Sequence, residues 1–177
     1  MTNLTPEDVR KKIRTVPDFP KPGILFRDIT TGIKDPDAMR AMVDYLCSRF
    51  KEVKIDYIAG IESRGFIFGM PMAYKLKCGF IPIRKPNKLP AKTIKETYEL
   101  EYGSDSIEIH ADAIEAGKNV LIVDDLLATG GTAEAACNLI KKTGGNLIGA
   151  AFLIELSELN GREKLHDCGK IVSMLKY

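Results

Sequence analysis

The sequence predicts an α/β fold with a central, mainly parallel sheet flanked by helices, and three observations lead to this prediction. Short apolar runs alternate with helix-forming segments over residues 57–156. The run at residues 120–123 is continuously apolar, as is typical of a strand that is buried on both faces. Glycines and prolines punctuate the boundaries between these segments. Such an alternation favours parallel strands joined by crossover helices.

The composition narrows the class of protein. The chain has 177 residues and is 45% hydrophobic, which suits one domain over residues 1–177. Its formal net charge of +2 gives no general reason to expect nucleic-acid or membrane binding. Glu7, Asp8 and Arg10 stand where a signal peptide would need an apolar run. No apolar run approaches the roughly 18 residues of a membrane span.

Cysteine usage predicts a cytoplasmic location. The four cysteines are Cys47, Cys78, Cys137 and Cys168, and no two of them form a Cys-x-x-Cys pair, which disfavours a zinc site. Cys47 and Cys137 fall in expected helices, where we expect them to pack as small hydrophobic residues. Free thiols without an export signal are typical of cytoplasmic proteins.

The N-terminal third predicts two helices separated by an extended segment. Thr5 can cap a first helix that has Pro6 at its first position, and we expect this helix to end near Arg14 or Thr15. Prolines at positions 17, 20 and 22 then enforce an extended backbone. A second helix is expected over residues 35–50, where apolar residues recur at helical spacing.

The remaining strands and helices are predicted from the periodicity of apolar residues and from the glycines and prolines between segments. Strands are expected at residues 57–60, 80–84, 120–123 and 147–156, and helices at residues 65–77 and 133–142. A hairpin is expected between residues 97–100 and 106–110, inserted between two strands of the sheet. The polar segment at residues 88–97 ahead of it predicts a mobile lid.

The segment at residues 124–132 is the most informative in the chain. Two adjacent carboxylates, Asp124 and Asp125, close the expected strand, and Thr129-Gly130-Gly131-Thr132 leads into a helix. Glycines let a backbone turn its N–H groups toward an anion, and the helix N-terminus favours negative charge. Carboxylates beside a phosphate site are suited to sugar hydroxyls or to a divalent cation. Together these features suggest that the ligand is a phosphorylated ribose. The loop lacks the Gly-Lys-[Ser/Thr] ending of an NTPase P-loop, which disfavours ATP hydrolysis.

Other candidate groups are ambiguous when taken alone. Arg64 follows a strand end at a helix start, where it could bind pyrophosphate or be a surface arginine. Arg84, Lys85 and Lys88 could bind a polyphosphate, but such a charge run is more often merely solvated. Phe26 could stack on a heterocycle or lie in the core.

These segments carry a resemblance. Residues 124–132 resemble the phosphoribosyl-pyrophosphate (PRPP) loop of the type I phosphoribosyltransferases. Residues 18–30, 58–66, 83–90 and 100–103 resemble the adenine phosphoribosyltransferase family more specifically. The resemblance implies the type I phosphoribosyltransferase fold, with an N-terminal helix and base-binding segment at residues 1–34 and a lid loop and hairpin at residues 85–110.

The resemblance also implies an activity. It implies an enzyme of purine salvage that transfers ribose-5-phosphate from PRPP to adenine, giving AMP and pyrophosphate. Magnesium would enter bound to PRPP, with no metal held directly by the protein. The resemblance implies a homodimer, and the composition adds the expectation of a cytoplasmic protein that binds neither nucleic acid nor membrane. Two alternatives stay open: transfer to another purine base, and an inactive regulator that senses PRPP or purines.

The family's functional residues are carried over position by position. The matching catalytic positions are Glu101, Tyr102 and Arg64. The matching adenine-binding positions are Leu25, Phe26 and Arg27. The matching PRPP-binding positions are Ser63, Arg64, Arg84, Lys85, Lys88, Asp124, Asp125, Ala128, Thr129, Gly130, Gly131 and Thr132. The resemblance further implies a cis peptide between Glu62 and Ser63, and an Arg84 that reaches the neighbouring subunit's site.

Overall fold

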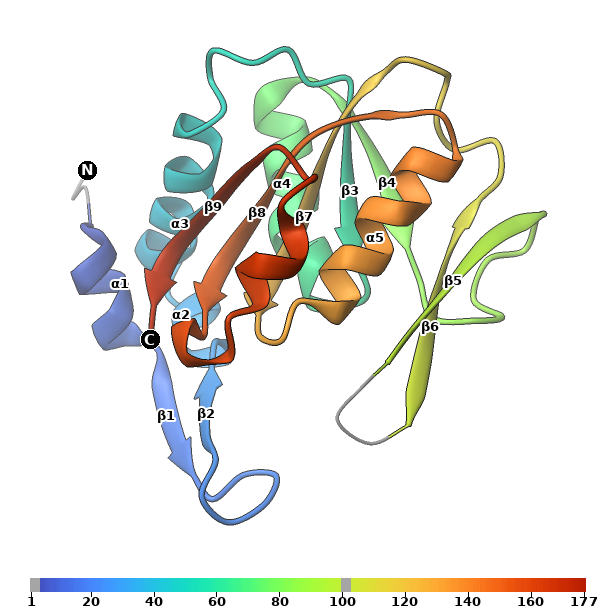
Figure 1. Cartoon of the computed structure of the whole chain (residues 1–177). Coiled ribbons are helices and arrows are strands. Elements are labelled where there is room, and N and C mark those ends of the chain that lie inside the picture. Colours follow the sequence, from blue (N-terminus) through green and yellow to red (C-terminus); the bar gives the residue numbers. More distant parts are fainter. Residues whose placement is uncertain (1–3, 100–102) are drawn as a thin grey trace. The chain divides into compact units, whose positions relative to one another are not determined.

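The computed structural model of the protein describes residues 4–99 and 103–177. The chain divides into two compact units, Met1–Tyr45 and Leu46–Tyr177 (Figure 1). The single domain expected over residues 1–177 stays a prediction.

The first unit contains two helices and a hairpin. Helix α1 (Pro6–Lys12) begins as predicted, because the Thr5 hydroxyl accepts from the Asp8 N–H at 3.2 Å and the Asp8 carboxylate accepts from the Thr5 N–H at 3.0 Å. Strands β1 (Arg14–Pro17) and β2 (Leu25–Asp28) then pair in antiparallel fashion, and α2 (Thr30–Lys34) follows. Helix α3 (Pro36–Ser48) carries the chain into the second unit.

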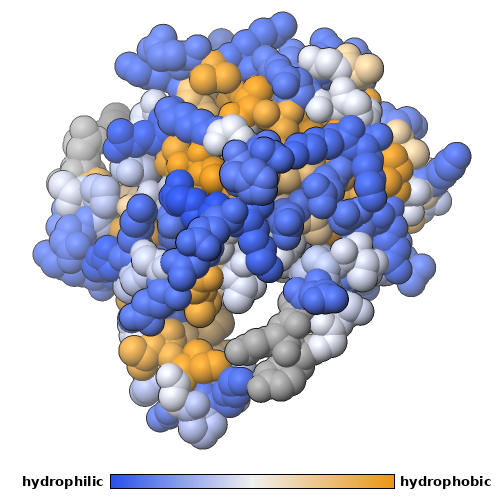
Figure 2. Space-filling view, viewed as in Figure 1, coloured by the Kyte–Doolittle hydropathy of each residue, from blue (hydrophilic) through white to orange (hydrophobic). Residues whose placement is uncertain are grey.

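The tip of the β1–β2 hairpin is apolar. Phe19 is 51% exposed and Leu25 is 56% exposed. Figure 2 shows apolar residues gathered around this tip, at the bottom of the view. The sequence predicted an extended segment here but neither the strand pairing nor α2.

The second unit is built on a parallel five-stranded sheet in the order β4-β3-β7-β8-β9. Its strands are β3 (Tyr57–Ile61), β4 (Gly79–Ile83), β7 (Asn119–Leu127), β8 (Asn146–Glu155) and β9 (Lys170–Lys176). The chain adds β4 on one side of β3 and then β7, β8 and β9 on the other. The order therefore reverses between β3 and β7, and in sheets of this kind ligands bind beyond the carboxyl ends of the strands at that point.

Two helices cover opposite faces of this sheet (Figure 1). The strand residues Ala59, Ile122 and Ala150 belong to the buried cluster that includes the apolar residues of α5 (Gly131–Lys142). Ile58 points to the other face, where a Cβ on Gly69 of α4 (Arg64–Leu76) would lie 3.4 Å from it. Both helices were predicted, and the alternation of faces explains why the strands are apolar throughout.

A second hairpin packs against α5. Strands β5 (Thr93–Glu99) and β6 (Ser104–His110) pair in antiparallel fashion, and β5 begins four residues before the predicted start. Tyr98 and Ile107 are buried in the core cluster. Because β5 already begins at Thr93, it takes in the end of the segment that the sequence predicted to be a mobile lid.

The predicted end of the central strand was wrong. We expected the strand to end at Val123, but β7 continues through Leu127, so the two aspartates lie within it. Leu126 and Leu127 continue the register with β8, opposite Ile154 and Glu155. The sequence also missed β9 and the short helices η1 (Ser157–Leu159) and η2 (Gly161–Leu165). The strand signal at residues 120–123 could not reveal pairing that depends on a distant strand.

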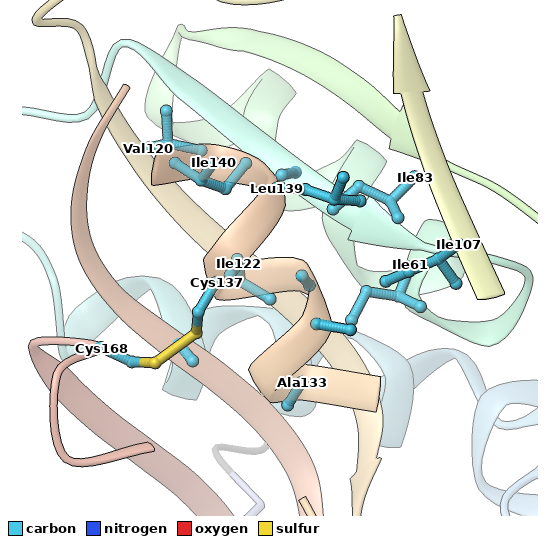
Figure 3. Close-up of a cluster of buried hydrophobic side chains, with 14 of the residues drawn as sticks. Ile61, Ile83, Ile107, Val120, Ile122, Ala133, Cys137, Leu139, Ile140 and Cys168 are labelled. Carbon is cyan, nitrogen blue, oxygen red and sulfur yellow. A yellow bond between two sulfur atoms is a disulfide. The ribbon is translucent and has the colours of Figure 1, made fainter. Parts of the chain in front are cut away.

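The expectation of four free thiols was wrong as well. Cys137 of α5 and Cys168, just before β9, form a disulfide with a Cα–Cα distance of 6.2 Å (Figure 3). Both cysteines are buried beside Leu139, Ile140 and Ile122 in the core cluster. Their separation of 31 residues hid the pairing, because only the packing of the segment after β8 against α5 brings them together. Cys47 is buried and Cys78 is partly buried.

Within residues 4–99 and 103–177, no helix is long and apolar enough to cross a membrane.

Candidate active site

A cavity of about 420 Å³ opens beyond the carboxyl ends of β3 and β7, where the strand order reverses. Its walls come from the β3–α4 turn, the β7–α5 loop, Lys85 and the β5–β6 hairpin. The lining residues are Ile61, Glu62, Ser63, Arg64, Lys85, Tyr98, Ile107, Asp124, Asp125, Leu126, Leu127, Ala128, Thr129, Gly130, Gly131, Thr132 and Ala133.

The β7–α5 loop presents a helix N-terminus to this cavity. Gly130 has a φ of +84° and precedes the first helical residue, Gly131. A residue with a side chain would be strained in that conformation, so glycine is what allows the chain to turn directly from strand to helix. The first N–H groups of a helix have no acceptor within the helix and carry the positive end of its dipole. This end of α5 is therefore suited to an anion such as a phosphate.

Arg64 and Asp125 link the two sides of the cavity. The Nε of Arg64, the first residue of α4, lies 2.7 Å from Oδ2 of Asp125 on β7. The Asp125 side chain is 8% exposed, whereas the Arg64 side chain is 46% exposed. The carboxylate thus holds one edge of the guanidinium, and the exposed remainder is available to a ligand anion. The Glu62–Ser63 peptide before Arg64 is cis, which confirms the prediction.

Asp124 has different surroundings from its neighbour. One of its oxygens accepts from the backbone N–H of Asp125 at 2.8 Å. Two causes raise the pKa of Asp124 well above its ordinary value. Burial is the larger cause, and the negative charge of Asp125 is the next. Hydroxyl donors or a cation at this position would compensate for that cost, so the acid pair is suited to a polyol or to a metal-bound ligand.

Lys85 enters the cavity from the end of β4. Its ammonium group contacts the Asp105 carboxylate and donates to the Tyr98 hydroxyl at 3.1 Å. Burial alone would lower the pKa of Lys85, but the hydrogen bonds to Asp105 and Tyr98 outweigh it and raise the pKa. The lysine is therefore a fixed positive charge in the cavity that Arg64 and the α5 N-terminus also line.

Arg84 and Lys88 occupy a different position. The guanidinium of Arg84 donates to both carboxylate oxygens of Glu62, each at 3.2 Å, and these hydrogen bonds lower the pKa of Glu62. Arg84 also donates to the Lys88 carbonyl at 3.4 Å. In the part of the chain that the structure describes, neither residue lines this cavity. Their PRPP contacts stay predictions.

The structure thus gathers most of the predicted PRPP residues around one cavity. They are Ser63, Arg64, Lys85, Asp124, Asp125, Ala128, Thr129, Gly130, Gly131 and Thr132. Sequence reasoning missed Tyr98 and Asp105, which hold Lys85. The two residues lie directly opposite each other in the β5–β6 register, which the sequence alone did not give.

The predicted adenine residues lie in the first unit, on β2. Leu25 is exposed, and the Phe26 ring lies edge-on to Phe19 with centroids 5.1 Å apart. Arg27 donates to the Thr15 hydroxyl at 2.5 Å. Phe26 is therefore half-buried in its own hairpin and is not a core aromatic of the sheet. The predicted catalytic residues Glu101 and Tyr102 lie outside the described residues.

Comparison with known proteins gives the family. Residues 33–175 match the phosphoribosyl transferase domain. The chain is 55% identical to adenine phosphoribosyltransferase of Gloeobacter violaceus over 170 residues, which are 96% of this chain and 99% of that protein. It is 57% identical to the enzyme of Acaryochloris marina over 161 residues, which are 91% and 95% of the two chains.

Solved structures agree with the sequence relatives. The crystal structure of adenine phosphoribosyltransferase from Thermoanaerobacter pseudethanolicus has a TM-score of 0.94 and 50% identity, covering 98% of this chain and 100% of that one. The Saccharomyces cerevisiae enzyme, complexed with an imino-altritol bisphosphate and adenine, has a TM-score of 0.90 and 44% identity, covering 96% and 98%. The chain has the type I fold that its sequence predicted, and it belongs to the phosphoribosyl transferase domain family and, within it, to the adenine phosphoribosyltransferases.

Proposed function

We propose that this protein is a pentosyltransferase that moves the ribose-5-phosphate group of PRPP to adenine, producing AMP and pyrophosphate in purine salvage. One observation carries the proposal. The N-terminus of α5, two aspartates and two cations converge on one cavity at the reversal point of the sheet. A phosphorylated sugar that also bears a diphosphate is a ligand that would use all of these groups.

Each group has a distinct task in this proposal. The β7–α5 loop, residues 128–132, binds the 5-phosphate through backbone N–H groups and threonine hydroxyls. Asp124 and Asp125 accept from the ribose hydroxyls. Arg64 and Lys85 bind the diphosphate on the opposite wall and stabilise the charge that grows on it as it departs. These contacts hold the anomeric carbon in line between the leaving group and the incoming base.

Magnesium fits this set of residues as a companion of PRPP. Asp124 and Asp125 carry the kind of oxygen that Mg²⁺ prefers, but two carboxylates are too few to hold the ion, and Asp125 is already engaged by Arg64. The ion would therefore enter with PRPP, and its ligands would be oxygens of PRPP and water. Bound in this way, the ion would neutralise part of the charge on the diphosphate.

For adenine, we propose recognition by the backbone of Leu25 and Arg27, with Phe26 stacked on the ring. A carbonyl oxygen that accepts from the exocyclic amine of adenine meets the wrong partner in a 6-oxo purine. Glu101 is the proposed acid/base group for the ring proton that adenine loses, and Tyr102 is proposed to cover the ribose. Both assignments rest on the sequence motif at residues 100–103.

We further propose a homodimer in which Arg84 reaches the neighbour's pyrophosphate. The proposal is supported by the position of Arg84, which is tied to Glu62 instead of lining its own chain's cavity. We propose a cytoplasmic location, because PRPP is a highly charged sugar phosphate that does not cross a membrane unaided. We propose no role for nucleic acid or membrane binding, since the net charge is only +2.

A panel of bases tests the proposed function. The protein is mixed with PRPP and Mg²⁺, each purine and pyrimidine base is added in turn, and nucleotide formation is measured. We expect rapid conversion of adenine and poor conversion of hypoxanthine and guanine. Equal turnover of hypoxanthine would favour a broader purine enzyme. No nucleotide from any base, despite measurable PRPP binding, would favour a regulator that senses PRPP.

A further inference from the structure

The PRPP loop rests on a second, unassigned turn of the chain. This supporting turn, residues 160–162, follows η1 and begins η2. A Cβ on Gly161 would lie 2.1 Å from the Ala128 carbonyl oxygen and 2.8 Å from the Gly130 nitrogen. Conversely, a Cβ on Gly130 would lie 2.3 Å from the Gly161 carbonyl oxygen. The two backbones are thus in direct contact, with no room for a side chain between them.

Arg162 fixes this turn to the sheet. Its guanidinium donates to both oxygens of Glu155, at 3.0 and 2.6 Å, and to the Ile171 carbonyl at 3.2 Å. Glu155 is the last residue of β8 and is 6% exposed, and Ile171 belongs to β9. The hydrogen bonds from Arg162 lower the pKa of Glu155, so the pair stays charged at neutral pH. A bidentate arginine–carboxylate pair fixes the relative orientation of the two side chains as well as the distance between them.

The far end of the same segment is also anchored. Leu165 is fully buried in the core cluster, and Cys168 is bonded to Cys137 of α5. The segment from Gly161 to Cys168 is thus fixed to β8 and β9 by Arg162 and to α5 by the disulfide. Through Gly161 the segment meets the cavity wall, because the Gly161 backbone lies against Ala128 and Gly130.

We propose that Arg162 is a positioning residue for PRPP: it holds Gly161 against the loop and so sets where the loop's N–H groups point. The inference rests on the proposed function of the loop. Backbone N–H groups cannot adjust as side chains do, so binding depends on the placement of the whole loop. A displacement of about 1 Å in such a site can cost up to a hundredfold in rate.

Three variants test the inference. Arg162→Met removes the guanidinium but keeps a side chain of similar volume. Arg162→Lys keeps the positive charge but cannot form a bidentate pair. Gly161→Ala places a methyl group against the PRPP loop. We expect Arg162→Met and Gly161→Ala to raise KM for PRPP about tenfold, with KM for adenine changed less than twofold. Arg162→Lys should recover part of the loss. The hydrogen-exchange rate of the loop amides should also rise in Arg162→Met and Gly161→Ala.

Two controls separate positioning from general destabilisation. Lys164→Met removes an exposed cation from the same segment. Gly117→Ala introduces strain at a φ of +77°, in the turn that precedes the amino end of β7, away from the site. Both should leave KM for PRPP unchanged. The inference is overturned if Arg162→Met leaves KM for PRPP and loop exchange as in the wild type, or if Gly117→Ala raises KM for PRPP as much.

Binding of ribose-5-phosphate, measured by calorimetry, keeps this test independent of the reaction. If the wild type binds ribose-5-phosphate but converts no base, the proposed function fails, and the positioning role is still judged from the affinities. A roughly tenfold weaker affinity in Arg162→Met, with the Lys164→Met affinity unchanged, supports the role. Equal affinities in all variants overturn it.

Discussion

Asp124 and Asp125 are adjacent in the chain but are stabilised differently. Arg64 compensates the charge of Asp125 at 2.7 Å, whereas burial and the charge of Asp125 raise the pKa of Asp124. A carboxyl whose folded-state pKa is raised contributes most to stability below its unfolded pKa, and that contribution is lost as the pH rises toward the folded pKa. In the protein without ligand, Asp124 therefore lowers the free energy of unfolding by an amount that grows with pH.

Asp124→Asn should relieve this cost. We expect the variant to be more stable than the wild type by about 0.5–2 kcal/mol at pH 8, with a gain that shrinks toward pH 4. Its use of PRPP should weaken, since an amide is a poorer acceptor for ribose hydroxyls. Asp125→Asn is the matched control and should lower stability, because it leaves Arg64 without its carboxylate. Urea unfolding at several pH values measures both, and a pH-independent gain for Asp124→Asn would contradict the account.

Glu101 can be tested against a nearby acid. Glu101→Ala should lower the turnover number about a hundredfold while PRPP binding changes little, because a general acid/base group acts mainly in the transition state. Glu99→Ala removes the same charge two residues earlier and should retain most of the turnover. Steady-state kinetics with adenine as the varied substrate distinguishes them. A wild-type turnover number in Glu101→Ala would leave this residue with no part in catalysis.

The β7–α5 unit joins a rigid strand to an anion-binding helix end. Thr132→Val keeps the shape of the side chain and removes one hydroxyl donor at the cavity. We expect catalytic efficiency with PRPP to fall about tenfold, which corresponds to the loss of one hydrogen bond to a charged ligand. Thr143→Val is the same change at the other end of α5, where the hydroxyl donates to the Ile140 carbonyl. The loop is not the phosphate site if both variants match the wild type.

Sequence patterns predicted the elements that local chemistry determines. The cap at Thr5, the strand at Tyr57, the helix after Gly130 and the Glu62–Ser63 peptide follow from short-range signals or a local motif. The end of β7 was misplaced because Leu126 and Leu127 are held by β8, a contact about thirty residues away.

In the candidate site too, features set by local sequence could be predicted, whereas features set by distant contacts could not. The loop residues of one segment could be assigned from sequence, since each acts where the chain places it. The Lys85–Asp105 and Arg162–Glu155 pairs could not, because each joins residues whose proximity depends on the sheet and hairpin register. The Cys137–Cys168 disulfide was missed for the same reason. Groups that hold a site in place are thus harder to predict than the groups that touch the ligand.

Mixing of inactive variants tests the proposed dimer with shared sites. Arg84→Ala and Asp125→Ala are each expected to be inactive, and subunit exchange should restore one complete site in each mixed dimer. Random exchange would then return about one quarter of the wild-type activity. Two copies of the same variant give no recovery and serve as the control. Proven exchange without recovered activity would mean that each chain completes its own site.

The most direct test of the central claim is the stoichiometry of the reaction. The protein is incubated with PRPP, Mg²⁺ and adenine, and the products are followed by phosphorus NMR. We expect AMP and pyrophosphate in equal amounts, and no release of pyrophosphate when adenine is left out. Pyrophosphate without AMP, or bound PRPP that stays intact in the presence of adenine, would contradict it.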